Sequence, residues 1–368
     1  MTQLSIAKIA DELRSLITPG PRMLDEAACV ASIMLAIALA HAIGAQMVAW
    51  AAFTAFVLMK GNPRETLLRG ILRIVGTMLG AALALAVVPI AASSLPLAMI
   101  AAALVGGVGL YGMITARRAY AWLLFGLTFE MILLDKLEHP DLDTLSFART
   151  RLLEVGAGTV ACVAVSVATA LLARRGDLAA PLEPVPRMRW HPGAARHAAQ
   201  AGVALALLPL LHALADIPQL AQAGVTIMAV MIVPVANIGA SGLVPVSQRL
   251  LQRALGCLAG GALALVVLLL AQGSAPALVA GTCLGIVIGR HIENGGSRAP
   301  YLGVQFTLAI LVVLVPDSYD QAQIHPAVQR LVSILVGMAL LEPVLLAWHA
   351  IAPSRKVESV KGPDLPSE

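Results

Sequence analysis

The sequence carries the same apolar helix start twice. Residues 73–84 read RIVGTMLGAALA and residues 253–264 read RALGCLAGGALA, so that Arg73, Gly76, Gly80 and Ala84 recur 180 positions later. Further along each copy, YAWLLF at 120–125 is matched by YLGVQF at 301–306. The apolar runs that carry these copies are long enough to cross a bilayer. A duplication of this kind is typical of a transporter-like protein built from two matching halves.

Composition indicates a membrane protein. Of the 368 residues, 59% are hydrophobic and 12% are charged, whereas a soluble domain is about 25% charged. The net charge is +4, and in a membrane protein such an excess marks cytoplasmic loops rather than a nucleic-acid surface. All four cysteines lie in apolar runs without CxxC spacing. We therefore expect no disulfide, no metal site and no cofactor.

Six apolar runs in each half predict an all-α polytopic membrane protein of about 12 transmembrane helices. Because six is an even number, the halves have the same orientation, which predicts two parallel six-helix repeats related by an axis along the membrane normal. Several runs are shorter than the about 20 residues of an ideal spanning helix. The runs fall at roughly 27–44, 45–59, 74–92, 95–115, 119–135, 152–173, 198–215, 218–236, 254–272, 275–289, 299–316 and 328–350.

Lysine and arginine placement predicts that both termini are cytoplasmic, because basic residues gather in alternate connecting segments. The predicted organisation has five parts: a cytoplasmic segment at 1–26, a first repeat at 27–173, a cytoplasmic linker at 174–197, a second repeat at 198–350 and a cytoplasmic tail at 351–368.

Five arginines are candidates for an anion pathway, because a guanidinium suits a carboxylate. Arg73 and Arg253 begin matching apolar runs on the cytoplasmic side, where they either attract anions or act as positive-inside anchors. Arg149, Arg151 and Arg330 break the charge rule by lying at outer ends of runs. Their alternative role is structural, as snorkelling side chains or ion-pair partners.

Three acids inside apolar runs are candidates for proton coupling, because an intramembrane charge is costly. Glu130 and Glu342 lie deep in their runs, and Glu154 is placed to pair with Arg151 at the i,i+3 spacing. None of the three has a matching acid in the other half, so any coupling is asymmetric.

Four glycines form two matching GxxxG elements, Gly76 with Gly80 and Gly256 with Gly260. In membrane helices this spacing favours close helix packing over ligand contact.

The residues WAAFTAFVLMKGNPRETLLRGILRIVGTMLGAALAL at 50–85 and RTRLLEVGAG at 149–158 resemble the fusaric acid resistance and aromatic acid exporter superfamily of membrane permeases. The marks are Thr54 in an apolar helix, an R-x-x-G-T-x-x-G helix start and an arginine-rich start of the sixth run. The second copy departs from the pattern, since Cys257 replaces Thr77. The resemblance implies a multi-pass permease of the bacterial inner membrane that exports aromatic or other weak carboxylic acids, often with a periplasmic adaptor protein.

We therefore predict a transporter of small organic anions rather than an enzyme. The sequence has no nucleotide-binding loop, so the membrane potential or the proton-motive force is the expected energy source. Two alternatives stay open: a passive anion channel, and a membrane scaffold subunit that recruits a periplasmic adaptor. Nucleic acid is not an expected partner.

Overall fold

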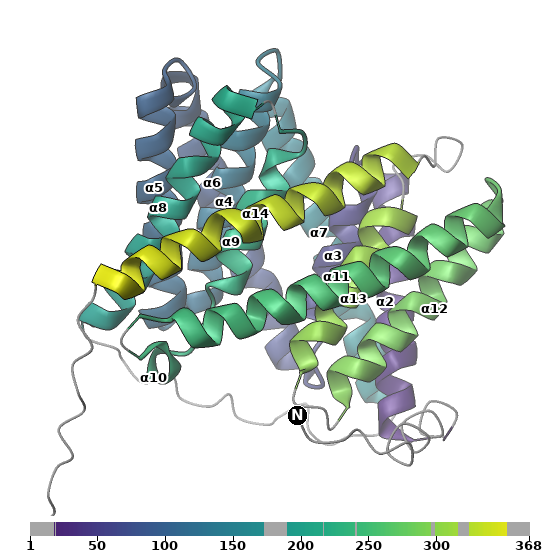
Figure 1. Cartoon of the computed structure of the whole chain (residues 1–368). Coiled ribbons are helices and arrows are strands. Elements are labelled where there is room, and N and C mark those ends of the chain that lie inside the picture. Colours follow the sequence, from purple (N-terminus) through teal and green to yellow (C-terminus); the bar gives the residue numbers. More distant parts are fainter. Residues whose placement is uncertain are drawn as a thin grey trace, which may run out of the picture.

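The computed structural model describes residues 18, 20–172, 190–215, 217–239, 241–295, 299–315 and 324–351. These residues form helices joined by short connections, and no strand occurs among them (Figure 1). The predicted linker at 174–197 and tail at 351–368, like the segment at 1–26, fall largely outside the described residues. The helices are α2 (Pro21–Ala42), α3 (Val48–Leu58), α4 (Pro63–Ala91), α5 (Leu95–Thr115), α6 (Ala119–Glu138), α7 (Thr144–Leu172), α8 (Pro192–Ala215), α9 (Leu220–Val230), α10 (Val235–Ile238), α11 (Leu243–Ala271), α12 (Ala275–Asn294), α13 (Pro300–Leu314) and α14 (Ile324–Ile351).

Eight helices in the described part of the chain are long and apolar enough to cross a membrane. They are α2, α4, α5, α7, α8, α11, α12 and α14, and three further apolar helices, α3, α9 and α13, are shorter. The protein is thus a multi-pass, all-helical membrane protein. The layout of about 12 spanning helices with both termini inside stays a prediction.

Two helices begin earlier than their apolar runs. The sequence predicts starts near residues 74 and 254, but α4 begins at Pro63 and α11 at Leu243. Asn62 caps α4 by accepting a hydrogen bond from the Arg64 backbone N–H at 2.9 Å, and Pro63 follows at the first helical position. The early turns are amphipathic, and apolarity alone does not detect such turns.

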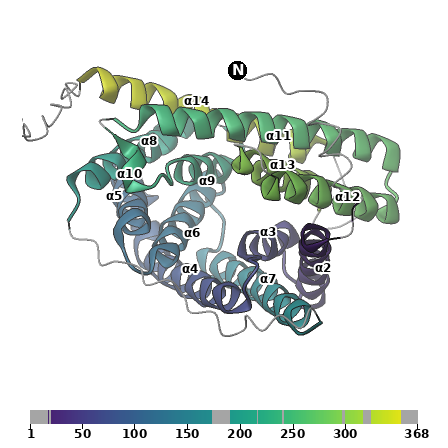
Figure 2. The same cartoon turned by 90° about the horizontal axis from the view of Figure 1, so that it is seen from below.

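Helix contacts occur in matching pairs. At one edge of the molecule α5 packs on α8, and at the opposite edge α12 packs on α2 (Figure 1). Nearer the centre, α6 contacts α9 and α13 contacts α3. Figure 2 shows α11 and α14 along one side, with α4 and α7 on the opposite side. The main contacts between the two halves of the sequence are therefore accompanied by their counterparts, as at an isologous interface.

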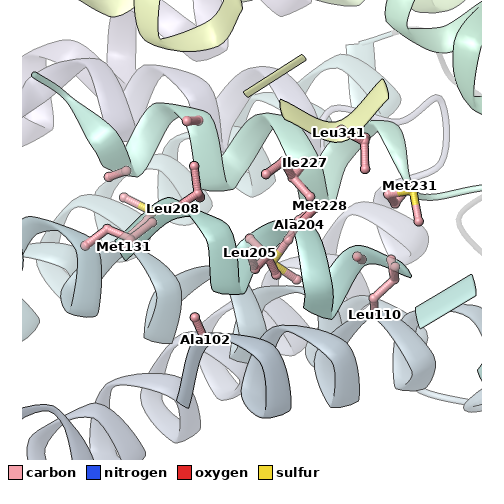
Figure 3. Packing of buried hydrophobic residues seen from close by; sticks show 14 of the residues in the cluster. Ala102, Leu110, Met131, Ala204, Leu205, Leu208, Ile227, Met228, Met231 and Leu341 are labelled. Atoms are coloured by element: carbon pink, nitrogen blue, oxygen red, sulfur yellow. The ribbon is translucent and has the colours of Figure 1, made fainter. Parts of the chain in front are cut away.

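The hydrophobic core mixes residues from both halves. Figure 3 shows part of one cluster, in which Ala102 of α5 and Met131 of α6 lie with Leu205 of α8 and Ile227 of α9. A second cluster joins α2, α3 and α7 to α11, α12 and α13. The halves are consequently packed against each other through apolar contacts, and the elements that face the centre are held firmly in place.

The contact between α2 and α12 ends in a buried ionic cluster. Arg290 donates from Nε to Asp25 at 2.7 Å and from one terminal nitrogen to Glu293 at 2.8 Å. His291 Nδ1 lies 2.6 Å from the carboxylate of Glu26. The cluster therefore joins the first and second halves through charges that are largely out of water.

Replacing Arg290 with glutamine is expected to destabilise the protein by about 3 kcal/mol, because it leaves carboxylates without their cation in a largely buried site. Glu65→Gln is the control, since Glu65 and Arg69 form an exposed i,i+4 pair at 3.1 Å that contributes less than about 0.5 kcal/mol. Thermal unfolding of each purified variant in detergent measures its loss of stability. Equal shifts in the unfolding temperature of the two variants would show that the buried cluster contributes no more than a surface pair.

Candidate functional site

A cavity of about 200 Å³ lies between the two halves of the chain. Helices α3, α4 and α6 line it from the first half, and α9, α11, α13 and α14 line it from the second. Three residues of each short helix face the cavity at matching positions: Trp50, Phe53 and Val57 in α3, and Gln222, Val225 and Ala229 in α9. The cavity thus has approximate two-fold symmetry in its lining.

Arg73 and Arg253 are the matching cations of this cavity. Each lies ten residues after the first residue of its helix, α4 or α11, which is about 15 Å along the helix axis. Both are buried, with 8% and 4% of their surface exposed. Arginine in such a position is costly unless its donors are satisfied.

Hydroxyl and amide groups from neighbouring helices hold the two guanidinium groups in similar ways. Arg73 donates to Thr54 Oγ1 at 3.1 Å and to the Tyr120 hydroxyl at 2.8 Å. Arg253 donates to Thr226 Oγ1 at 3.0 Å and also to Gln305 Oε1. Each arginine is therefore fixed by a threonine of the short helix and by a polar residue of α6 or α13.

Neither arginine has a carboxylate partner among the described residues, since all their polar contacts are with neutral groups. Two buried positive charges thus face one largely apolar cavity without compensating negative charge. An anionic ligand would supply that compensation.

Aromatic rings and further arginines lie beside this pair. The guanidinium of Arg249 stands 4.0 Å from the ring centre of Tyr301, and that of Arg69 stands 5.6 Å from the ring centre of Tyr120. Arg249 also lines the cavity. These cation–π contacts orient the tyrosine rings and add positive charge next to the cavity.

A second, smaller cavity of about 50 Å³ adjoins the first. It shares Trp50, Arg73, Leu124, Leu127 and Val225 with the larger one. The residues that line only the smaller cavity are Thr54, Thr77, Thr128, Met131, Arg151, Glu154 and Val155. Its lining is consequently more polar than that of the larger cavity and comes mainly from the first half.

Arg151 and Glu154 form a buried ion pair at this smaller cavity. Arg151 NH1 lies 3.2 Å from Glu154 Oε2, and 4% and 0% of the two side chains are exposed. The guanidinium also stands 4.9 Å from the ring centre of Trp50 and 4.8 Å from that of Phe147. Glu154 Oε1 accepts a hydrogen bond from the Met47 backbone N–H at 3.0 Å, directly before α3.

Two family models match the chain. One, described as the fusaric acid resistance protein family, matches residues 28–187, and the other, described as fusaric acid resistance protein-like, matches residues 205–341. The chain belongs to the fusaric acid resistance family. Membrane proteins of this family are associated with efflux and transport. Searches of curated proteins and of solved structures found no match.

The other candidates from the sequence lie outside both cavities of this fusaric acid resistance family protein. Arg149 is exposed, and Arg330 is half-buried and donates to the Val312 carbonyl at 3.0 Å. Glu130 of α6 lies beside Gly106 of α5, away from the cavities. Glu342 accepts a hydrogen bond from the Ser247 hydroxyl at 2.8 Å. No group of three histidine, cysteine or acidic side chains in the described ranges could hold a metal ion.

The four glycines of the GxxxG elements lie at helix crossings. A Cβ atom on Gly80 would stand 2.4 Å from the Phe125 carbonyl oxygen, and one on Gly260 would stand 2.4 Å from that of Phe306. Gly76 and Gly256 approach α6 and α13 in the same way, with distances of 2.3 Å and 2.6 Å to a backbone oxygen. These close approaches set the position of the helices that carry Arg73 and Arg253.

Sequence reasoning missed the polar partners contributed by the second half. Thr226 and Gln305 bind Arg253, and Gln222 lines the larger cavity; each is a polar residue within an apolar helix. The criterion that marked Thr54 would have found them. The runs at 45–59 and 218–236 match as the second run of each half, but the residue-by-residue match of α3 with α9 is offset from that of α4 with α11. The reason is that the connection from α9 to α11 is longer than that from α3 to α4 and contains α10.

Proposed function

We propose that this protein is a permease that exports organic anions, aromatic or other weak carboxylic acids, across the bacterial inner membrane. The observation that carries the proposal is the pair of buried arginines, Arg73 and Arg253, facing one cavity without a carboxylate partner among the described residues. Family membership supports transport as the activity. In this proposal the two halves are parallel six-helix repeats, both termini are cytoplasmic and the substrate path runs between the halves.

The cavity suits an amphipathic acid. A guanidinium binds a carboxylate through paired, charge-assisted hydrogen bonds. The remaining lining is mostly aromatic and aliphatic, including Phe53, Leu123, Leu127 and Leu308, which favours an apolar body behind the charged group. The volume of about 200 Å³ is below the roughly 300 Å³ at which pockets for drug-sized ligands begin. We therefore expect a substrate of about one ring.

The membrane potential is a sufficient driving force for this direction. An interior-negative potential favours the exit of an anion by about 2.3 kcal/mol per charge per 100 mV. Proton coupling through Glu130, Glu154 or Glu342 is an alternative in which the proton-motive force contributes. A periplasmic adaptor is a proposed partner, because the superfamily that the sequence resembles often works with one.

Flux measurements on the purified full-length protein in liposomes test the proposal. We expect saturable, potential-dependent transport of a radiolabelled aromatic carboxylate, with competition by other weak acids and little transport of the corresponding neutral amide. A rate that rises linearly with concentration, without competition, would indicate a passive channel. Absence of flux under both a potential and a pH gradient would reject the permease and favour the scaffold role.

A further inference from the structure

The smaller cavity contains donors that the described residues do not satisfy. Arg151 Nε and NH1 are buried and have no hydrogen-bond acceptor among the described residues, although NH1 lies within ion-pair distance of Glu154. The Thr77 hydroxyl, 1% exposed, also has no hydrogen-bond partner in the described part of the chain. Arg151 NH2 contacts the Met47 sulfur, which is a weak acceptor. The site therefore offers unused donors to an acceptor from outside.

Glu154 is held so that it neutralises Arg151 only in part. Its Oε1 atom is engaged by the Met47 backbone N–H, and its Oε2 atom meets Arg151 at one terminal nitrogen. The two-bond, fork-like geometry that a guanidinium prefers with a carboxylate is thus not formed. Arg73 lines the same cavity, so the charged side chains among its lining residues are two arginines and one glutamate.

The size of the cavity limits what it can hold. A cavity must offer roughly 10–15 Å³ to hold one water molecule. The smaller cavity, at about 50 Å³, therefore holds a few waters or one carboxylate group and is too small for a ring. Because the larger cavity is adjacent and shares Arg73, the apolar body of a bound acid can stay there while its carboxylate enters the smaller one.

The second half lacks this arrangement. Ser333 of α14 is buried and donates to the Gln219 carbonyl at 2.7 Å, directly before α9. Glu154 of α7 contacts the Met47 backbone directly before α3, so the two side chains hold corresponding positions. A serine thus stands at this place without any charge, and it contacts the opposite backbone group, since Ser333 donates to a carbonyl whereas Glu154 accepts from an N–H. The carboxylate at position 154 is therefore particular to the first half.

We infer that the smaller cavity is a subsite for the carboxylate group of the transported acid, in which Glu154 is the resident competitor for Arg151. An arriving carboxylate binds between Arg73 and Arg151 and displaces Glu154 from the guanidinium. The inference rests on the proposed function and assigns Glu154 a role in regulating substrate affinity. Glu154 has no acidic counterpart at position 333, which makes the two halves unequal, and it compensates Arg151 in part when the subsite holds no substrate.

Binding measurements that do not depend on transport test this inference. Trp50 lines both cavities and lies beside Arg151, so its fluorescence reports on the subsite. The remaining tryptophans, Trp122, Trp190 and Trp348, are replaced with phenylalanine. The purified single-tryptophan protein is titrated in detergent with formate, with cyclohexanecarboxylate and with chloride, none of which absorbs where tryptophan does.

We expect both carboxylates to change the Trp50 signal. Glu154→Ser, which copies the chain's own second half, and Glu154→Gln should each lower the apparent Kd for carboxylates by at least about tenfold, because the competing charge is gone. Carboxylates should also raise the unfolding temperature of these variants more than that of the unsubstituted protein. Arg151→Gln should abolish the response to formate.

An unchanged Kd in both Glu154 variants, with folded protein by thermal unfolding, would overturn the inference, as would binding of formate to Arg151→Gln with unchanged affinity. A response to chloride alone would show a halide site instead and would also overturn it. Failure of the proposed function is distinguishable, since absent liposome flux leaves these binding results intact, whereas normal flux with unchanged Kd values rejects only the subsite.

Discussion

Replacing Arg73 and Arg253 together with glutamine is expected to reduce anion flux by on the order of 100-fold. A hydrogen bond to a charged group contributes about 1.5–3 kcal/mol, and each 1.4 kcal/mol corresponds to about a tenfold change in affinity. The anion flux of each single variant should therefore fall by about tenfold or more. Because the two arginines occupy matching positions in one cavity, the two single losses should be similar. Flux into liposomes at low substrate concentration gives the values.

The stability of these variants separates transport from folding. The Nε2 atom of glutamine stands at the chain position of arginine Nε, so at residue 73 it can donate to Thr54 as the native side chain does. It also removes a buried charge that has no counter-ion among the described residues, so the unfolding temperature should stay equal or rise.

Arg149→Gln is the control for charge. Arg149 is exposed and lines neither cavity, so the anion flux of the Arg149→Gln variant should remain normal. If the double variant transports at the normal rate, the arginine pair does not belong to the pathway.

Adding one methyl group at Gly80 or Gly260 is expected to destabilise the protein by about 1–3 kcal/mol, the usual cost of overpacking. The new Cβ would stand 2.4 Å from a backbone carbonyl oxygen of α6 or α13, so the helices must separate. Gly80 lies seven residues after Arg73 on α4, and such a shift also displaces the guanidinium from the cavity. We therefore expect Gly80→Ala to lower both the unfolding temperature and the flux.

Gly156→Ala provides the matched control. Gly156 lies within α7 and a Cβ there has no neighbour within 4 Å. Alanine is the better helix former by about 1 kcal/mol, so this variant should be as stable as the native protein or more stable. The two substitutions thus predict opposite signs for the same chemical change. Equal effects at positions 80 and 156 would mean that close packing of α4 on α6 does not govern stability.

The residues that face the cavity could be predicted only in part. Arg149 and Arg151 both break the charge rule, yet Arg149 is exposed and Arg151 is buried. Residues two apart on a helix differ by about 200° in direction, since each residue turns the helix by about 100°. Which direction meets the cavity depends on how α7 packs against α3 and α4, and nothing in the local sequence fixes that rotation.

The sequence by itself determined the membrane environment, the helical class, the duplicated architecture and the family, because apolarity, charge placement and motif spacing are properties of the chain read locally. It also identified Arg73 and Arg253 as candidates through the spacing of glycines that follows each of them. Only the tertiary structure decided that these two arginines face a common cavity, that Thr226 and Gln305 are partners of one of them, and that Glu154 shares a small chamber with Arg151. The physical reason is that a cavity is a property of how helices pack, and packing joins residues that lie far apart in the sequence.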